Sequence, residues 1–230
     1  MLKKNGFTPS DGPVLLVVMD GIGISEATEG NAVKNAFTPN LDKLIKEQPN
    51  ILLKAHGTAV GLPSDDDMGN SEVGHNAIGA GQVYAQGAKL VTEAIKTGEI
   101  FKAKGWTEIR SNCISKSSTL HFIGLFSDGN VHSHIDHLKA MINQAKSEGI
   151  KKVCVHILLD GRDVGETSAL EYITPFETFL SELNDTTFDA RIASGGGRMF
   201  ITMDRYEANW SMVERGWYTH VLGEGRLFNS

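Results

Sequence analysis

A glycine-rich stretch at positions 65–81, DDDMGNSEVGHNAIGAG, carries one serine hydroxyl, that of Ser71, with acidic residues upstream and His75 four residues downstream. A serine hydroxyl is a poor nucleophile unless a base or a metal ion takes its proton. Such a serine is also a common helix-capping residue, and the two roles are compatible. At a helix start, free backbone N–H groups and the helix dipole would stabilise a phosphate on the hydroxyl. Ser71 is therefore a candidate phosphate carrier that depends on residues elsewhere.

A further acidic residue, Asp20, follows the apolar run VLLVVM at residues 14–19 and precedes Gly21. An Asp at a rigid strand end can supply a carboxylate oxygen to a hard divalent cation. The same residue could instead cap a helix or form a turn. The spacing leaves both interpretations open, so Asp20 is a candidate metal ligand.

Arginines suited to an anionic ligand occur in the second half of the chain. A guanidinium group binds phosphate or carboxylate through two parallel hydrogen bonds, although most arginines form surface salt bridges. The candidates are Arg162, Arg198 and Arg205, and Arg198 directly follows three glycines that let a ligand approach the backbone. Asp163 is a candidate general acid or base on a substrate hydroxyl, and His132 could act likewise or donate a hydrogen bond.

Alternating apolar runs and amphipathic stretches predict the elements that position these residues. Strands are expected at 14–19, 51–55, 120–125, 153–159, 190–193 and 220–222. Helices are expected from Thr38-Pro39, from near Ser71, at 88–97, after a Ser133 cap, at 168–183 with a bend or break at Pro175, and at 204–215. This order predicts an α/β fold with a mainly parallel sheet, whose carboxyl strand ends gather the functional groups.

Composition limits the class of protein and its partners. The 230 residues are 40% hydrophobic and 22% charged, which is typical of a soluble globular protein with one large or two smaller domains. The net charge of −6 argues against nucleic acid or an anionic membrane as the main partner. No apolar run reaches the ~18 residues of a membrane span, and the N-terminus lacks a signal-peptide core. Cys113 and Cys154 are expected to be buried reduced thiols, which favours the cytoplasm.

Other notable residues are expected to be structural. The glycine-rich stretches are followed by no Gly-Lys-Ser/Thr and form no G-x-G-x-x-G turn, which disfavours kinases and dehydrogenases. Glycines at 79–87 are candidates for a hinge or domain crossing. A structural role is assigned to His121, His134 and His137, and a packing role to Trp106, Trp210 and Trp217.

Six segments together resemble a known family. They are VVMDGIGI, KAHGTAVGLPSDDDMGNSEVGHNAIGAG, LFSDGNVHSH, LDGRDV, ASGGGRMF and TMDRYEANW, in this order. The chain is similar to the cofactor-independent (2,3-bisphosphoglycerate-independent) phosphoglycerate mutases, most of all the plant and kinetoplastid type. The resemblance covers nearly the whole chain, and GNSEVGHNA and ASGGGR are its most specific segments.

The resemblance implies an alkaline phosphatase-like domain, partial here at residues 1–85, and an inserted α/β transferase domain, truncated here at 86–230. It implies two divalent metal ions, Mn²⁺ first and Mg²⁺ or Co²⁺ as possibilities, and no 2,3-bisphosphoglycerate. Ser71 would be the phosphoryl acceptor and, with Asp20, a metal ligand. The substrate would be held by His132, Arg162, Asp163, Arg198 and Arg205, with Asp163 also the acid or base. The reaction would interconvert 3-phosphoglycerate and 2-phosphoglycerate in glycolysis and gluconeogenesis, in a cytoplasmic monomer.

The sequence departs from the family in length, and this matters for activity. The chain lacks the later Asp/His clusters that supply most metal ligands in the family, so we expect it to be inactive by itself. There are two alternative interpretations. The chain could belong to another metal-dependent phosphatase or phosphomutase of the same superfamily, or it could be a non-catalytic phosphoglycerate-binding fragment. Asn130 stands where a glycine is common in the family, which we expect to matter little.

Overall fold

The computed structural model describes residues 6, 8, 11–19 and 22–228. The chain divides into two compact units, Met1–Leu53 and Lys54–Ser230, and each is described separately. None of the helices in the described ranges is both long and apolar enough to cross a membrane.

The first unit contains two short helices, α1 (Ala32–Asn35) and α2 (Pro39–Glu47). The predicted helix after Thr38 is confirmed, with Pro39 in its first turn and the Thr38 hydroxyl donating to Asp42. The predicted strand at 14–19 is wrong, since these residues form neither helix nor strand and their apolar side chains are 49 to 86% exposed. An apolar run becomes a strand only beside another strand, and the described part of this unit offers none. Residues 51–55 are likewise not a strand.

The second unit begins with a small helical region. It comprises the 3₁₀ turn η1 (Gly57–Val60), α3 (Ser71–Ala80), α4 (Gly87–Lys96), α5 (Glu99–Lys102) and α6 (Lys104–Lys116). Val60, Leu62 and Val73 form a small core, and the buried Gln86 side chain donates to the carbonyls of Val60 and Val73. The helices predicted near Ser71 and at 88–97 are therefore confirmed.

A three-stranded parallel sheet forms the centre of the second unit. Its strands are β1 (Leu120–Phe126), β2 (Lys152–Leu159) and β3 (Asp189–Gly197), in the order β1-β2-β3. Helix α7 (Ile135–Ser147) connects the first two strands and α8 (Ala169–Leu183) the last two. The α/β fold with a parallel sheet is confirmed. Helix α8 continues through Pro175 without interruption.

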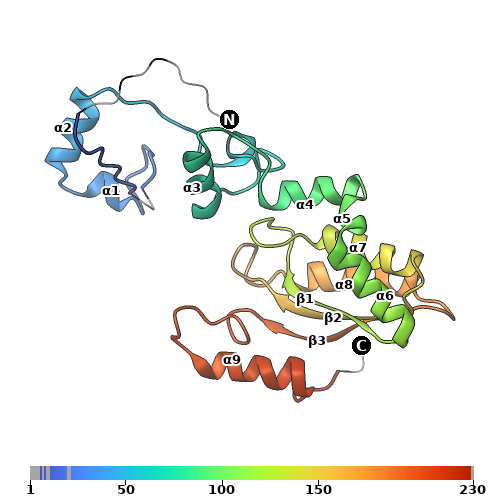
Figure 1. The fold of residues 1–230 in the computed structure, drawn as a ribbon. Helices are drawn as coiled ribbons and strands as arrows, with labels where there is room; N and C mark the ends of the chain where they lie inside the picture. Colours follow the sequence, from blue (N-terminus) through green and yellow to red (C-terminus); the bar gives the residue numbers. More distant parts are fainter. Residues whose placement is uncertain (1–5, 7, 9–10, 20–21, 229–230) are drawn as a thin grey trace. The chain divides into compact units, whose positions relative to one another are not determined.

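The main core lies between one face of the sheet and helices α6 to α8, which Figure 1 shows on one side of the strands, with α9 (Trp210–Trp217) on the other. Val153, Val155 and Ile157 of β2 alternate with half-buried residues, as expected of a strand that packs one face more tightly. Ile142 of α7 and Phe176 of α8 are fully buried against them. The helix predicted after Ser133 is thus confirmed, although its N-cap is His134 and not Ser133, whose hydroxyl donates to the Leu125 carbonyl.

The other face of the sheet carries a row of hydrogen-bonded side chains. His121 Nδ1 lies 2.9 Å from His156 Nε2, and His156 Nδ1 lies 2.6 Å from Ser194 Oγ. Ser194 Oγ in turn lies 2.7 Å from His220 Nδ1. Burial and then the charges of His121 and His220 lower the pKa of His156. These contacts support a structural role for His121.

The C-terminal predictions need correction. The predicted helix at 204–215 starts only at Trp210, because Tyr206 and Glu207 have positive φ angles and the Asn209 side chain caps the Met212 N–H. The predicted strand at 220–222 is the π-helical turn η2 (Tyr218–Leu222). Trp106 is buried as predicted, whereas the side chains of Trp210 and Trp217 are exposed. Cys113 is buried and Cys154 half-buried, both as free thiols.

Candidate functional site

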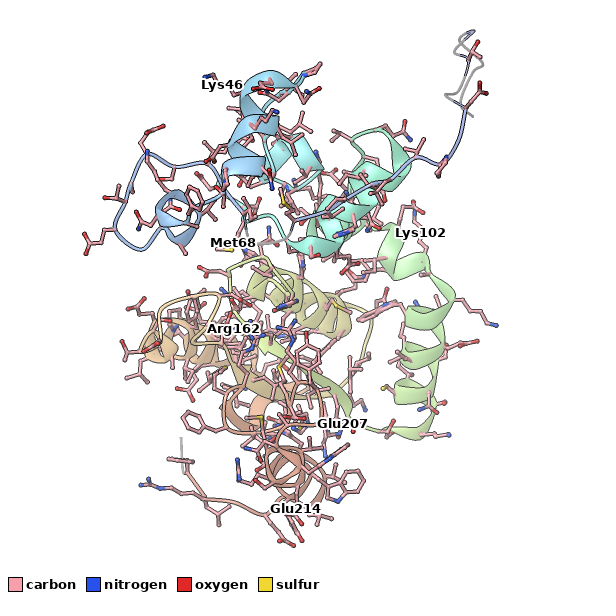
Figure 2. The ribbon with its side chains drawn as sticks, turned by 90° about the vertical axis from the view of Figure 1, so that its left-hand side faces the viewer. Lys46, Met68, Lys102, Arg162, Glu207 and Glu214 are labelled. Carbon is pink, nitrogen blue, oxygen red and sulfur yellow. The ribbon has the colours of Figure 1, made fainter. Side chains whose placement is uncertain are left out.

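The carboxyl ends of the three strands bring most of the candidate residues together. Because the strands are parallel and Phe126 pairs with Leu159, which pairs with Gly197, the loops that follow them start side by side. These loops contain His132 after β1, the turn at 160–163 after β2 and Arg198 after β3. Figure 2 labels Arg162 in this part of the molecule and Met68 on the segment before α3.

A buried ion pair forms the centre of this edge. Nη1 of Arg198 donates to Asp160 Oδ1 at 3.0 Å and to Asp163 Oδ2 at 2.7 Å. The side chain of Arg198 is 7% exposed, that of Asp160 is fully buried, and that of Asp163 is 15% exposed. Asp160 Oδ1 also accepts the backbone N–H groups of Arg162 and Asp163, at 3.1 and 3.0 Å. One carboxylate therefore fixes both the turn and the guanidinium.

Burial and hydrogen bonding oppose each other in this cluster. Burial by itself raises the pKa of the Asp160 carboxyl, but the Ser127 side chain, followed by the Asp163 amide, Arg198 and the Arg162 amide, holds it below its usual value. Burial likewise lowers the pKa of Arg198, and the contacts with Asp163 and Asp160 outweigh it and raise the pKa. The Asp160 carboxylate and the Arg198 guanidinium are therefore both charged at neutral pH.

The other predicted substrate residues surround this ion pair more loosely. His132 Nε2 lies 3.8 Å from Asp163 Oδ2, and its side chain is 56% exposed. Arg162 is exposed in the turn, and the described residues offer it no ionic partner. Arg205 is exposed in the loop after β3 and stacks on Tyr206, with its Cζ 4.8 Å from the ring centroid. Arg198, Asp163 and His132 are thus brought together, whereas Arg205 has no described contact with them.

A pocket of about 860 Å³ opens beside the turn. Its lining includes Arg162, Phe126, Tyr172 and Phe200. The Tyr172 hydroxyl donates to Asp128 at 2.7 Å, and this hydrogen bond, followed by burial, raises the pKa of Tyr172 to about 12. Sequence reasoning assigned no role to Tyr172, because a tyrosine within an amphipathic helix has the same pattern as a packing residue.

Ser71 is exposed as the first residue of α3, and Asn70 is the N-cap, since its side chain accepts the Val73 N–H. The Ser71 hydroxyl lies 3.2 Å from His75 Nδ1, and that nitrogen lies 2.7 Å from the Ser71 carbonyl oxygen. A carbonyl can only accept a hydrogen bond, so Nδ1 carries the proton. His75 therefore does not act as a base on the Ser71 hydroxyl in this geometry.

The segment before α3 contacts the loop that follows β1. Asn130 Nδ2 donates to Asp67 Oδ1 at 2.6 Å, and Asp67 Oδ2 accepts from the backbone and hydroxyl of Ser64. Burial raises the pKa of Asp67, but the hydrogen bonds from Asn130 and Ser64 bring it below its usual value. Asn130 has φ of 58°, a left-handed conformation that glycine and asparagine adopt most readily. This conformation explains why asparagine fits at this position.

The predicted metal ligands cannot be assembled into a centre from the described residues. Asp20 lies outside them, and Ser71 has His75 as its side-chain hydrogen-bond partner. Within residues 11–19 and 22–228, no group of three or more His, Cys, Asp or Glu side chains could hold a metal ion. Divalent ions need about six oxygen or nitrogen ligands. The described residues do not form such a site.

Comparisons with known proteins agree on one family. The family model described as the BPG-independent PGAM N-terminus matches residues 91–230. The chain is 58% identical over 219 residues to a probable 2,3-bisphosphoglycerate-independent phosphoglycerate mutase of Leptospira interrogans, covering 94% of this chain and 40% of the relative. It is 51% identical over 218 residues to the 2,3-bisphosphoglycerate-independent phosphoglycerate mutase of Trypanosoma brucei brucei, again covering 94% and 40%.

A solved structure extends the similarity to three dimensions. The crystal structure of Leishmania mexicana phosphoglycerate mutase at low cobalt concentration matches with a TM-score of 0.83 and 50% identity, covering 93% of this chain and 39% of that one. The chain therefore spans about 40% of the length of the relatives it matches.

Proposed function

The chain belongs to the BPG-independent PGAM N-terminus family, and we propose from this premise that the protein carrying it is a 2,3-bisphosphoglycerate-independent phosphoglycerate mutase. The proposed reaction interconverts 3-phosphoglycerate and 2-phosphoglycerate through a phosphoserine at Ser71, as a step of glycolysis and gluconeogenesis in the cytoplasm. The observation that carries the proposal is the cluster of Arg198, Asp163 and His132 at one edge of the sheet, in a chain about half identical to named mutases.

Each side chain at this edge has a role in the proposal. Arg162, Arg198 and Arg205 would bind the carboxylate and phosphate of the substrate through their guanidinium groups. Asp163, which is 15% exposed, would move a proton to or from a glycerate hydroxyl. His132 is exposed enough to donate a hydrogen bond to the bound ligand. The substrate class that fits this set is a small acid that carries a phosphate.

Ser71 would accept the phosphoryl group. Its hydroxyl is exposed, and its backbone N–H lies in the first turn of α3, where partial positive charge stabilises an anion. Asp20 and Ser71 stay proposed ligands of a divalent ion, Mn²⁺ first, because carboxylate and hydroxyl oxygens suit a hard cation. The assignment of residues 1–85 to a phosphatase domain and 86–230 to a transferase domain also belongs to this proposal, as does a monomeric state.

Detection of the phosphoserine tests the proposal. The protein carrying this chain is incubated with Mn²⁺ and 3-phosphoglycerate labelled in its phosphate, quenched in acid and digested for mass spectrometry. We expect label on Ser71, loss of label in Ser71→Ala, and normal label in Ser115→Ala, which removes an exposed hydroxyl of α6. Full interconversion by Ser71→Ala would refute the assignment of the acceptor.

Two measurements separate the proposed mutase from the alternatives. A phosphatase would release inorganic phosphate from 3-phosphoglycerate at a rate that added glycerate does not change, whereas a mutase would form 2-phosphoglycerate. The expectation that the 230-residue chain does not turn over by itself stays a prediction, tested by an enolase-coupled assay with manganese. Calorimetry with 3-phosphoglycerate on wild type and Arg198→Ala tests whether the chain still binds the ligand.

A further inference from the structure

Asp160 is the most enclosed charged side chain at the carboxyl edge of the sheet. It directly follows β2, and its side chain is fully buried beside Arg198. Its Oδ1 receives three donors: the amides of Arg162 and Asp163 and Nη1 of Arg198. Its Oδ2 is also buried, and the buried Ser127 side chain lies near enough to lower the pKa of this carboxyl further. Asp160 is therefore surrounded by the groups whose positions it fixes.

The geometry of Arg198 shows what Asp160 achieves. Both carboxylates contact the same nitrogen, Nη1, and no described residue accepts from Nη2 or Nε. The side chain of Arg198 as a whole is 7% exposed. The guanidinium is therefore held at one end, and two of its nitrogens stay available to a ligand. A planar group held in this way binds a carboxylate or phosphate without losing further side-chain freedom.

The same carboxylate fixes the turn that carries two proposed substrate residues. Because the amides of Arg162 and Asp163 both donate to Oδ1, the backbone of the turn cannot rotate without breaking two hydrogen bonds. The side chain of Arg162 starts from this fixed backbone and lines the pocket. The carboxylate of Asp163 is oriented from the other side by Arg198.

We propose that Asp160 is a positioning residue for the proposed reaction: it fixes the Arg162–Asp163 turn and one end of Arg198, so that these groups meet the phosphoglycerate in a preset arrangement. The inference rests on the proposed function for its ligand. Asp160 itself does not need to contact the substrate in this role. A preset arrangement of this kind matters for ligand binding, because small displacements of the binding groups weaken their contacts with the ligand strongly.

Binding measurements on the full 230-residue chain test this proposal. Isothermal calorimetry with 3-phosphoglycerate compares wild type with Asp160→Ala and Asp160→Asn. We expect Asp160→Ala to bind on the order of tenfold to a hundredfold more weakly, since it removes the acceptor for all three donors. Asp160→Asn retains an acceptor oxygen of the same size and should recover a large part of the affinity. Equal affinity of Asp160→Ala and wild type would overturn the proposal.

A matched control separates positioning from loss of stability. Val153→Ala destabilises the core at the amino end of β2, away from the turn, and should leave the affinity for 3-phosphoglycerate unchanged. Asp189→Ala removes the same charge from the opposite end of β3 and should also bind normally. If Val153→Ala weakens binding as much as Asp160→Ala, the effect is only structural and the proposal is wrong.

A second readout does not depend on the ligand. Amide hydrogen exchange followed by NMR should show faster exchange at Arg162 and Asp163 in Asp160→Ala, with the amides in the middle of β2 unchanged. If the wild-type chain binds no 3-phosphoglycerate, this edge of the sheet does not hold the ligand by itself, while the exchange rates still decide whether Asp160 orders the turn. Unchanged exchange at both amides would overturn the positioning role.

Discussion

Replacement of Arg198 by methionine gives a quantitative test of the buried ion pair. Methionine retains an unbranched stem but removes the charge from a side chain that is 7% exposed. Asp160, fully buried, would keep its two amide donors and lose its only positive partner. Breaking a buried ion pair from one side costs about 3–5 kcal/mol, and the remaining amide donors place our expectation near the lower end, about 3 kcal/mol.

The pH dependence of this loss has a definite sign. In the wild type the pKa of Asp160 is lowered, so its contribution to stability is present above the unfolded value and is lost as pH falls through the folded value. In Arg198→Met, loss of the guanidinium raises this pKa relative to the wild type, and the Ser127 side chain and the two amides are then the remaining groups that lower it. The carboxyl then takes up a proton on mild acidification, and the penalty shrinks. We expect the difference in unfolding free energy to fall to about half between pH 7 and pH 4.5.

Urea unfolding measures both effects. The fluorescence of Trp106, buried in the main core with its Nε1–H donating to Glu148, reports the transition. The double variant Arg198→Met/Asp160→Asn removes the unpaired charge and should recover more than 1 kcal/mol relative to the single Arg198→Met variant. A loss below about 0.5 kcal/mol for Arg198→Met, or strict additivity in the double variant, would refute the reasoning.

Three further predictions concern the fold of the second unit. Phe176→Ala should lower the urea-unfolding free energy by about 3–5 kcal/mol, because the side chain is fully buried, whereas Leu170→Ala, 72% exposed, should change it by less than about 0.5 kcal/mol. Gly195→Ala should cost about 1–3 kcal/mol, since its methyl group would lie 2.6 Å from a neighbouring side chain, whereas Gly124→Ala has open space and should be tolerated. Burial and two neighbouring histidines lower the pKa of His156, so the unfolded chain binds more protons and stability should fall as pH drops below about 6.5. Urea midpoints at pH 7.5 and 5.5 check this, and His156→Gln should reduce the difference.

The parallel sheet and its helices could be predicted because burial leaves a direct pattern in the sequence. The strand over Lys152–Leu159 is mostly apolar, and α7 places Ile135 and Ile142 on one face at helical spacing. The apolar run at 14–19 has the same pattern but forms no strand in the described residues. Hydrophobic pattern reports a tendency to be buried, and pairing with a neighbouring strand is a separate requirement.

Local backbone geometry accounts for the other errors. The helical pattern at 204–215 is interrupted by the positive φ angles of Tyr206 and Glu207, which no periodicity reveals. The N-cap of α7 falls on His134, one residue after Ser133, because the Ser133 hydroxyl is used by the Leu125 carbonyl. Side-chain competition of this kind depends on tertiary contacts and is not encoded in cap preferences.

The candidate site could be predicted in part. Strand ends of a parallel sheet meet at one edge, so the proximity of Arg198, Asp163 and His132 follows from the alternation of strands and helices. Asp160 could not be assigned in this way, because an Asp after a strand has the same sequence pattern whether it forms an exposed turn or receives three buried donors. Its role depends on which donor atoms the tertiary structure brings to its carboxylate.

The charged groups around each arginine indicate different roles for Arg198 and for the exposed Arg162 and Arg205. The single positive charge of Arg198 already faces two carboxylates, Asp160 and Asp163, so this group of three has a net charge of −1 and cannot attract an anion by charge alone. The chain as a whole is also negative, at −6. In the proposed reaction, attraction of a phosphoglycerate would come from Arg162 and Arg205, whose guanidinium groups are exposed and form no ion pair with described residues. Arg198 would then contribute hydrogen-bond geometry, and the exposed Arg162 and Arg205 would supply the positive charge. Because salt screens exposed charges most, a higher ionic strength should weaken the contribution of Arg162 and Arg205 to ligand affinity more than that of Arg198.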